Sequence, residues 1–431
     1  MTGAETGPNH GAAGKSLVRC TCEEPVRVAL IEPLGQSGPL DIAYSLGCAL
    51  RRRGIDATLV TTRTHHPPVA GSAELPLVGL LGGMDRARPR FLRALDYTAS
   101  LFTLWRFLRG GAFDLLHFQD SLLPQLDAPL LAALKASGAR VVFTAQDPDQ
   151  DAINSPGGRD QKRSGGLRLR RLSLGRIYSV VDHVVALSEC GRRDLLESFG
   201  VPARKVSAIP HGNCESYIEN GGPGAAHAKA QLGIPVGNPV VLFFGSIKPT
   251  KGVDHLLRAF RRVHEACPSS LLLVAGEPRR GVDGGSLVDL ARCQGLDGAV
   301  RLHLGYVAND RVPLYFSAAD VVALPYTNVY QSGVVQMAYA FRRPVVASRV
   351  GGLAEVVEDG RTGLLVPPGD EDALAEALVT LLSSAEARRR MGECGHRLAA
   401  KKYSWGAIAE RMATVYESVV TSTAAEEGRG K

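Results

Sequence analysis

The sequence predicts an α/β protein made of two successive doubly wound domains, and three observations support this. The length of 431 residues exceeds the ~250–300 residues at which a single core usually stops growing. Short apolar runs alternate with amphipathic helical stretches through most of the chain, a pattern typical of a parallel sheet covered by helices. The alternation occurs twice, and a glycine-rich interruption at Gly221, Gly222 and Gly224 separates the two series.

The composition excludes several classes of protein. Apolar residues make up 45% and charged residues 22%, the balance of an ordinary globular chain. No uninterrupted apolar run reaches the ~18 residues that a membrane helix needs. The polar N-terminal segment has no apolar centre of the kind found in signal peptides. The sequence therefore predicts a cytoplasmic protein with a disordered leader at residues 1–24.

The charged residues and the cysteines favour neither a nucleic-acid partner nor a metal site. A net charge of +7 is mild for this length and suits anionic substrates or a membrane surface. The eight cysteines are scattered without zinc spacing, so we expect reduced thiols. The densest basic stretch runs from Arg159 to Arg176. It is either a solvated helix face or a surface for an anionic acceptor or phospholipid headgroups, which would give a peripheral contact with the inner face of the membrane.

In the first half of the chain, apolar runs predict six strands joined by helices such as Leu40–Arg53. The stretch 147–166 breaks this rhythm with Pro, Gly, Asp and Arg, which predicts a mobile active-site loop or a disordered segment. The six predicted strands are Val26–Ile31, Ala57–Thr61, Leu115–Phe118, Arg140–Thr144, His183–Leu187 and Val206–Ile209.

The second half repeats the pattern and ends in amphipathic helices at Asp372–Leu382, Glu386–Ala400 and Trp405–Thr421. Its predicted strands are Val240–Phe244, Leu271–Ala275, Val300–Leu304, Val321–Leu324, Val345–Ala347 and Gly363–Val366. The predicted boundaries are residues 25–217 for the first domain, 218–237 for a linker, 238–402 for the second domain, 403–421 for a last helix and 422–431 for a disordered tail. Ligands of such folds bind at the carboxyl ends of the strands, so residues just after strands are the first candidates for a binding site.

The first candidate site is a glycine-containing turn directly after the first strand. Gly35, Gln36, Ser37 and Gly38 stand between this strand and a helix. Backbone N–H groups of such a turn, together with the helix N-terminus, can hold an oxyanion. The alternative is an ordinary tight turn, because the full dinucleotide-binding spacing of glycines is absent.

The second candidate site opens the second series of strands. A strand ends at Gly245, and Lys248 and Lys251 follow before a helix that begins near Val253. Lysines at a helix N-terminus interact unfavourably with the helix dipole, which favours a functional explanation for their position. Two ammonium groups there would neutralise a diphosphate, in the ground state and as a leaving group. The alternative is a solvated loop with two incidental lysines.

The third candidate site lies at the start of a later helix, around Gln331, Ser332, Gly333 and Val334. Ser332 is expected to cap this helix while free N–H groups face a phosphate. Plain helix capping without a ligand is the alternative. A fourth candidate is His211, after the last strand of the first domain, where the two domains should face each other. It is either catalytic or a loop histidine with structural hydrogen bonds.

These segments, in this order and spacing, resemble the glycosyltransferases of family 4, which have the GT-B architecture. The resemblance covers nearly the whole chain from Val26 to Val420 and is strongest from Val240 to Leu382. The motifs that carry it are Phe244-Gly245 to Lys251-Gly252, Ala318-Ala319-Asp320 with Leu324-Pro325, Pro344 to Gly352, Glu358-Asp359-Gly360 with Thr362 to Val366, Ile209 to Asn213, and Tyr403-Ser404-Trp405.

The resemblance implies two Rossmann-like domains facing across a cleft, with the C-terminal helix crossing back to the first domain. It implies a UDP- or GDP-linked sugar as co-substrate in the second domain and a hydroxyl-bearing acceptor (glycan, glycolipid or natural product) mainly in the first. Hexose transfer would proceed with retention of configuration, without cofactor or metal, because basic residues hold the diphosphate. Lys251 matches the family's phosphate-binding lysine, and Lys248 stands where one branch carries its basic residue.

The sequence departs from the family at several polar positions. The arginine expected near Lys251 is Ser246, and the first-domain histidine is Gln146. The family's paired glutamates fall on Val329 and Met337, or on Asn328 and Gln336 after a one-residue slip, so no carboxylate is present. The run from Gln331 to Val334 resembles a branch that has replaced these acids. The leading hypothesis is therefore an active transferase. The alternatives are a non-catalytic nucleotide-sugar-binding protein or partner subunit, and a different GT-B activity such as sugar-nucleotide epimerisation or phosphorolysis.

Overall fold

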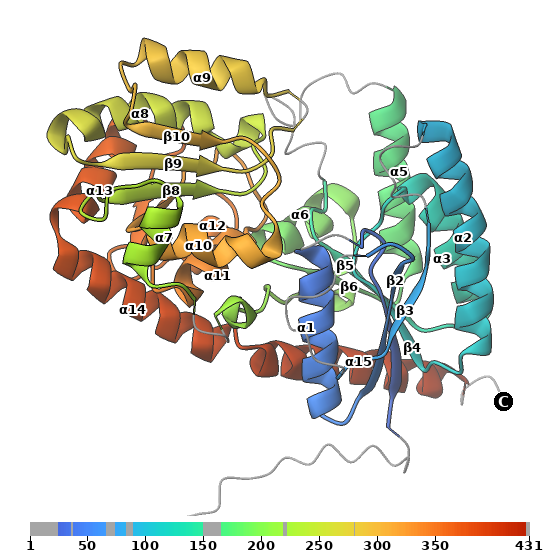
Figure 1. Ribbon diagram of the computed structural model, residues 1–431. Helices are drawn as coiled ribbons and strands as arrows, with labels where there is room; N and C mark the ends of the chain where they lie inside the picture. The colour runs from blue at the N-terminus through green and yellow to red at the C-terminus, as the bar shows by residue number, and fades with distance from the viewer. Residues whose placement is uncertain are drawn as a thin grey trace, which may run out of the picture.

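The computed structural model describes residues 25–35, 38–65, 74–82, 89–149, 165–218, 222–279 and 281–427. Two parallel sheets, each with helices on both faces, lie next to each other in the molecule (Figure 1). This is the predicted pair of doubly wound domains. In the described part of the chain, no helix is both long enough and apolar enough to span a membrane.

The first sheet is parallel throughout and has the strand order β3-β2-β1-β4-β5-β6-β7. All six predicted strands are present, with ends shifted by a residue or two. An additional edge strand, β3, pairs with β2 and was not predicted. The strands are β1 Arg27–Ile31, β2 Asp56–Thr62, β3 Leu77–Leu81, β4 Leu115–Phe118, β5 Val141–Ala145, β6 His183–Ala186 and β7 Val206–Ala208.

Helices cover both faces of this sheet because each presents an apolar stripe to it. Side chains of α2, α3 and α5 share one core cluster with the sheet, and those of α1 share another on the opposite face. The helices of the first domain are α1 Pro39–Arg52, α2 Arg90–Gly110, α3 Pro124–Ala136, α5 Gly165–Val180 and α6 Glu189–Phe199.

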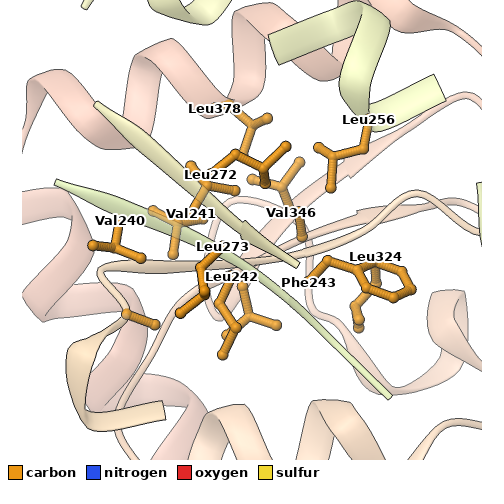
Figure 2. Close-up of a cluster of buried hydrophobic side chains, with 14 of the residues drawn as sticks. Val240, Val241, Leu242, Phe243, Leu256, Leu272, Leu273, Leu324, Val346 and Leu378 are labelled. Carbon is orange, nitrogen blue, oxygen red and sulfur yellow. The ribbon is translucent and has the colours of Figure 1, made fainter. Parts of the chain in front are cut away.

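The second sheet has the order β10-β9-β8-β11-β12-β13. Its central strands are apolar along their whole length, as expected of strands buried on both faces. Figure 2 shows this core, in which Val241, Leu273, Leu324 and Val346 from the sheet meet Leu256 and Leu378 from the covering helices. The strands are β8 Val240–Phe244, β9 Leu271–Ala275, β10 Val300–His303, β11 Val321–Leu324, β12 Val345–Ser348 and β13 Gly363–Val366.

The helices of the second domain begin inside the segment predicted as a linker. Helix α7 lies within residues 218–237, and its Ala228 joins the second core, so much of this segment is part of the second domain. The helices are α7 Ala225–Gln231, α8 Val253–Ala266, α9 Gly284–Cys293, α10 Val312–Ala318, α11 Gly333–Ala340, α12 Leu353–Val356, α13 Glu371–Ser383 and α14 Ala385–Lys402.

The last helix, α15 (Trp405–Glu427), crosses from the second domain to the first, as predicted (Figure 1). Its apolar side chains, Ile408 and Met412 among them, pack beside α1 in the first-domain core. The Tyr416 hydroxyl lies 2.6 Å from Nδ1 of the buried His117. The helix continues to Glu427. The prediction of a disordered tail from residue 422 is therefore wrong for residues 422–427. The predicted leader lies outside the described residues.

Candidate active site

A cavity of about 400 Å³ lies between the two domains, at the carboxyl ends of both sheets. The first-domain part of its wall comes from the start of α1 and from the segments after β5 and β7, and the second-domain part from the end of β8 and the start of α11. The structure brings together these predicted residues as its lining: Gly38, Gln146, His211, Gly245, Gln331, Gly333 and Val334. Gln36 and Ser37 lie outside the described residues.

In the turn after β1, the N–H groups of the described residues Leu34, Gly35 and Gly38 are taken up by carboxylates of the chain itself. The buried Glu32 carboxylate accepts hydrogen bonds from the N–H groups of Leu34, at 2.8 Å, and Gly35, at 2.7 Å. The N–H of Gly38 donates to Asp41 at 3.1 Å. Burial raises the pKa of Glu32, and these backbone donors oppose the rise. These three N–H groups are therefore satisfied within the chain, and Gly35 is required because a Cβ would meet Oγ1 of Thr62 at 1.8 Å.

The turn that carries His211 is clamped at the point where the chain crosses back. The indole Nε1 of Trp405 donates to the Asn213 carbonyl at 3.0 Å, and the Asn213 N–H donates to the Tyr403 carbonyl at 2.6 Å. A side chain at Gly212 would collide with Trp405, since its Cβ would lie 2.4 Å from the indole. Burial lowers the pKa of His211 to about 4, so its imidazole faces the cavity in the neutral form.

Lys251 ends a short 3-10 turn, Pro249–Lys251, that leads into α8, and Lys248 directly precedes this turn. Gly252 joins the turn to the helix with φ +64°, and a Cβ there would meet the Pro325 carbonyl at 2.0 Å. The Thr327 N–H donates to the Thr250 carbonyl at 2.9 Å. The lysine turn is thus held against the segment that follows β11, which fixes the backbone from which Lys251 projects.

Lys251 rests on an aromatic ring and faces a carboxylate of the other domain. Its Nζ lies 3.6 Å from the ring centroid of Tyr326, a cation–π contact. Burial lowers the pKa of Lys251 to about 8, and Asp147 opposes the shift. The pKa of Lys248 is lowered for the same reason, again against Asp147. Two ammonium groups and one carboxylate therefore meet where the ends of β5 and β8 approach each other.

The lowered pKa of Lys251 predicts pH-dependent donor binding. In the free protein the ammonium form declines as pH rises through about 8, so the electrostatic attraction for a diphosphate declines with it. We expect the Kd of UDP or GDP, measured by calorimetry, to rise steadily from pH 7.5 to pH 9.5. Lys251→Ala should bind more weakly at pH 7.5 and show a flatter pH profile, and an equally steep profile in this variant would assign the effect to another group.

The start of α11 differs from the prediction in one respect. Ser332 occupies the N-cap position with an extended backbone, but its hydroxyl makes no capping hydrogen bond. This hydroxyl lies 3.5 Å from the Tyr326 hydroxyl. The hydroxyl points toward Tyr326 instead of back to the helix N–H groups, so the prediction of a Ser332 cap is wrong. Gly333 and Val334 at the start of the helix line the large cavity, whereas Ser332 lines a second cavity of about 200 Å³.

Because Ser332 does not cap α11, its removal should affect binding and leave stability unchanged. We expect Ser332→Ala to weaken donor binding by about 1 kcal/mol, or about fivefold, the usual net value of one hydrogen bond. The melting temperature should stay within experimental error of the parent. A lowered melting temperature with unchanged donor affinity would instead indicate a capping role.

The residues at the positions where the family carries its paired glutamates contribute no carboxylate to the cavity. Met337 lines the cavity with its thioether chain, and Val329 is buried nearby. Gln336 is 3% exposed and lines a second cavity, of about 200 Å³, on the far side of His211. Any polar contacts to a sugar from this wall therefore come from backbone groups and neutral side chains.

A smaller cavity of about 280 Å³ lies in the first domain, and Gln146 lines both this cavity and the larger one. Its wall includes Asp120, Asp147 and Arg170. Burial raises the pKa of Asp120 to about 7, with a smaller rise from the charge of Asp147. The Gln146 amide is oriented by donating to the Gln119 carbonyl at 3.2 Å.

Sequence reasoning missed the residues that act only across the domain boundary. Asp41 on α1 accepts hydrogen bonds from the Tyr217 hydroxyl and from Nδ2 of Asn309, each at 3.1 Å. Asp147 and Tyr326 were likewise not predicted as site residues. Their partners lie far away in the sequence, so no local spacing could have indicated them, although Asp147 follows a strand end directly.

The structure describes only part of the predicted basic stretch, and the arginines of that part differ in their exposure. Residues 159–164 lie outside the described residues, and the rest lie on α5. Arg171 turns inward to Asp149 and to the Ser198 carbonyl, whereas Arg168 and Arg176 are exposed. Among the described residues, no three His, Cys, Asp or Glu side chains gather as metal ligands would.

Comparisons with known proteins agree with this architecture. Residues 238–384 match the family described as "Glycosyl transferases group 1", and residues 42–213 match "Glycosyltransferase Family 4". A D-inositol 3-phosphate glycosyltransferase of Kineococcus radiotolerans is 31% identical, over 93% of this chain and 97% of its own. The corresponding protein of Nocardia farcinica is 29% identical, over 92% and 90%.

Solved structures show the same fold. Sucrose-phosphate synthase from Thermosynechococcus elongatus superposes with a TM-score of 0.72 at 23% identity, covering 92% of this chain and 100% of the other. The Anabaena protein HepE, in complex with UDP and glucose, gives a TM-score of 0.72 at 20% identity, covering 91% and 100%. Three findings agree: two Rossmann-like domains face each other, the last helix returns to the first domain, and a full-length relative is more than 30% identical. The chain therefore belongs to the family 4 glycosyltransferases of GT-B fold.

Proposed function

We propose that this glycosyltransferase moves a hexose from a UDP- or GDP-linked sugar to a hydroxyl acceptor, with retention of the anomeric configuration. The observation that carries the proposal is the pair Lys248 and Lys251, held on a rigid turn beside the N-terminus of α8. Positive charge that opposes a helix dipole is costly unless an anion occupies the same place. A diphosphate, which gains negative charge as it leaves the sugar, is such an anion.

The large cavity is lined by Gly245 and the start of α11 but not by Lys248 or Lys251, so the proposed donor lies in this cavity with its diphosphate reaching beyond it to the lysine turn. Free N–H groups at the N-terminus of a helix favour phosphate oxygens. Gly245 and Gly333 let the backbone of the second domain approach the donor closely, because neither has a side chain to hold it away. The Anabaena neighbour was solved with UDP and glucose, which agrees with a nucleotide-sugar donor for this chain.

The first domain would supply the acceptor side of the reaction. Gln146 and the neutral His211 line the cavity from this domain and can hydrogen-bond sugar hydroxyls. The cavity beside Asp120 and Asp147 leads away from Gln146 and offers room for an acceptor, a glycan, glycolipid or natural product. The curated relatives named above act, by their names, on an inositol phosphate. No cofactor enters the proposal, since the nucleotide sugar is a co-substrate.

The proposal is tested by incubating the purified protein with a panel of UDP- and GDP-linked hexoses. We expect one of them to be hydrolysed slowly to the nucleoside diphosphate, with the released sugar first appearing in the donor's anomeric configuration by proton NMR. The double variant Lys248→Ala, Lys251→Ala should lose this turnover. Tight donor binding without any turnover would overturn the proposal in favour of a non-catalytic binding protein, and first release of the opposite anomer would overturn retention.

A further inference from the structure

We propose that Tyr416 on α15 and His117 on β4 are positioning residues for sugar transfer, because the hydrogen-bond network that begins at them holds the amide of Gln146 at the cavity. This inference rests on the function proposed above, in which Gln146 contacts a sugar. Tyr416 and His117 themselves line none of the three cavities described above. The returning helix therefore contributes to the reaction as well as to the fold.

The face of the first sheet that α15 covers carries buried polar side chains beside apolar ones. Leu115 on β4 and Val142 on β5 join the core cluster that includes α1 and α15. Side chains two residues apart on a strand point to the same side, so His117 and Thr144 face α15 as well. They are 0% and 3% exposed. Burial of such groups is costly unless each is hydrogen-bonded, and their partners show what they hold in place.

His117 links α15 to β5. The Tyr416 hydroxyl lies 2.6 Å from Nδ1 of His117, and Nε2 lies 2.8 Å from Oγ1 of Thr144. Burial lowers the pKa of His117 to about 3, so the imidazole is neutral and has one N–H to donate. The amide nitrogen of Gln119, which can only donate, lies 3.1 Å from Nδ1. Nδ1 therefore accepts, and the Nε2–H donates to Thr144.

The network reaches the cavity where β4 and β5 end. Gln119 directly follows β4, and Gln146 directly follows β5. The Gln146 amide donates to the Gln119 carbonyl at 3.2 Å, and the Gln119 N–H donates to the Ile31 carbonyl at 2.8 Å. Gln146 lines the large cavity and the smaller first-domain cavity. The direction of its amide therefore depends on Gln119, which the His117 ring and β1 hold from two sides.

A buried polar network can also serve the fold alone, by fixing the register of a helix on a sheet. The continuity of this network favours a role in positioning, because every step from α15 to Gln146 is a hydrogen bond or a short stretch of strand. Its last member stands beside the proposed reacting groups. A misplacement of about 1 Å at such a point can lower a rate about 100-fold, even when the substitution is remote.

The second domain holds a similar pair that provides a matched control. The Tyr315 hydroxyl lies 3.0 Å from Nδ1 of His303. The two rings meet edge to face at 85°, and those of Tyr416 and His117 at 78°. Tyr315 and His303 line none of the three cavities. Tyr315→Phe therefore removes the same kind of hydroxyl without touching the network.

The test is a double-mutant cycle on slow donor hydrolysis, measured with the UDP- or GDP-linked hexose that the parent turns over. Tyr416→Phe keeps the ring and should lower kcat about tenfold through lost orientation. The donor Kd should stay unchanged, because the second domain holds the donor. Gln146→Ala should lower kcat at least as far. In the Gln146→Ala protein, Tyr416→Phe should have no further effect, since it acts through that residue.

Thr144→Val should behave like Tyr416→Phe, and Tyr315→Phe should turn over like the parent. Parent-like turnover in Gln146→Ala would overturn the proposal. So would equal losses from Tyr416→Phe with and without Gln146, because these would indicate a role in the fold. A crystal structure of Tyr416→Phe should show the Gln146 amide turned away from the Gln119 carbonyl, and an unmoved amide would also overturn it. Absence of turnover in the parent would contradict the proposed function, and the amide position would still decide the positioning.

Discussion

Replacement of Gly333 by valine is expected to abolish donor binding while leaving the melting temperature nearly unchanged. Gly333 is the first residue of α11 and lines the cavity, and an ideal Cβ built there has no atom within 4 Å. The fold therefore has room for a Cβ here, and we expect the valine methyl groups to project into the space that phosphate oxygens would occupy. Valine is no worse than glycine at a helical position, so the fold should tolerate it.

Calorimetric titration with UDP or GDP, alongside thermal unfolding, measures both parts of this prediction. Gly333→Ala is the graded control: a single methyl group should weaken binding less than valine does, with no change in stability. Unaltered affinity in the valine variant would mean that the start of α11 does not touch the donor. A large drop in melting temperature would mean that the glycine serves the fold.

Lys251→Ala is the second large effect, expected on turnover. Removal of one preorganised electrostatic group from a reacting centre typically costs about 2–4 kcal/mol of transition-state stabilisation, or roughly 30- to 900-fold in kcat/KM. The ammonium group of Lys251 is already held on the Tyr326 ring, so its position needs little rearrangement when the donor arrives. A loss in kcat/KM smaller than about threefold would contradict the assignment.

Two further variants separate charge from position. Lys248→Ala should have the smaller effect, because Lys248 lies further than Lys251 from the start of α8. Tyr326→Leu removes the ring beneath Lys251 and should lower kcat/KM, while Tyr326→Phe keeps the ring and should restore most of it. Equal losses in the leucine and phenylalanine variants would mean that the ring does not act through the lysine.

Most of the fold follows from the sequence because the strands of parallel sheets are continuous apolar runs. The strand that was missed, β3, is an edge strand with a half-exposed Leu-Val-Gly-Leu-Leu run, so it lacks that signal. The predicted linker was too long because α7 is short and rich in alanine, so its sequence gives little sign of a core helix. Its packing against α10 assigns it to the second domain. The returning helix was predictable because its apolar stripe must be buried somewhere.

The site was predictable wherever a residue follows a strand or opens a helix. His211, Gly245 and Gly333 reach the cavity for this reason. Side-chain direction was not predictable: the Ser332 hydroxyl lies toward Tyr326 instead of capping α11, and the Glu32 carboxylate accepts from the N–H groups of Leu34 and Gly35 in the turn that was predicted to hold an oxyanion. The same holds for contacts across the domain boundary, where each half of a pair is locally unremarkable.

The crossing of α15 has a consequence for the order of events during synthesis. The helix completes a face of the first sheet next to α1, yet the ribosome makes the whole second domain between the two helices. A nascent first domain therefore carries an uncovered apolar groove for the time needed to translate the second. Domains usually fold as they emerge, N-terminal domain first. Here the earlier domain should reach its final stability only after the later one is finished, and until then its groove is open to chaperones.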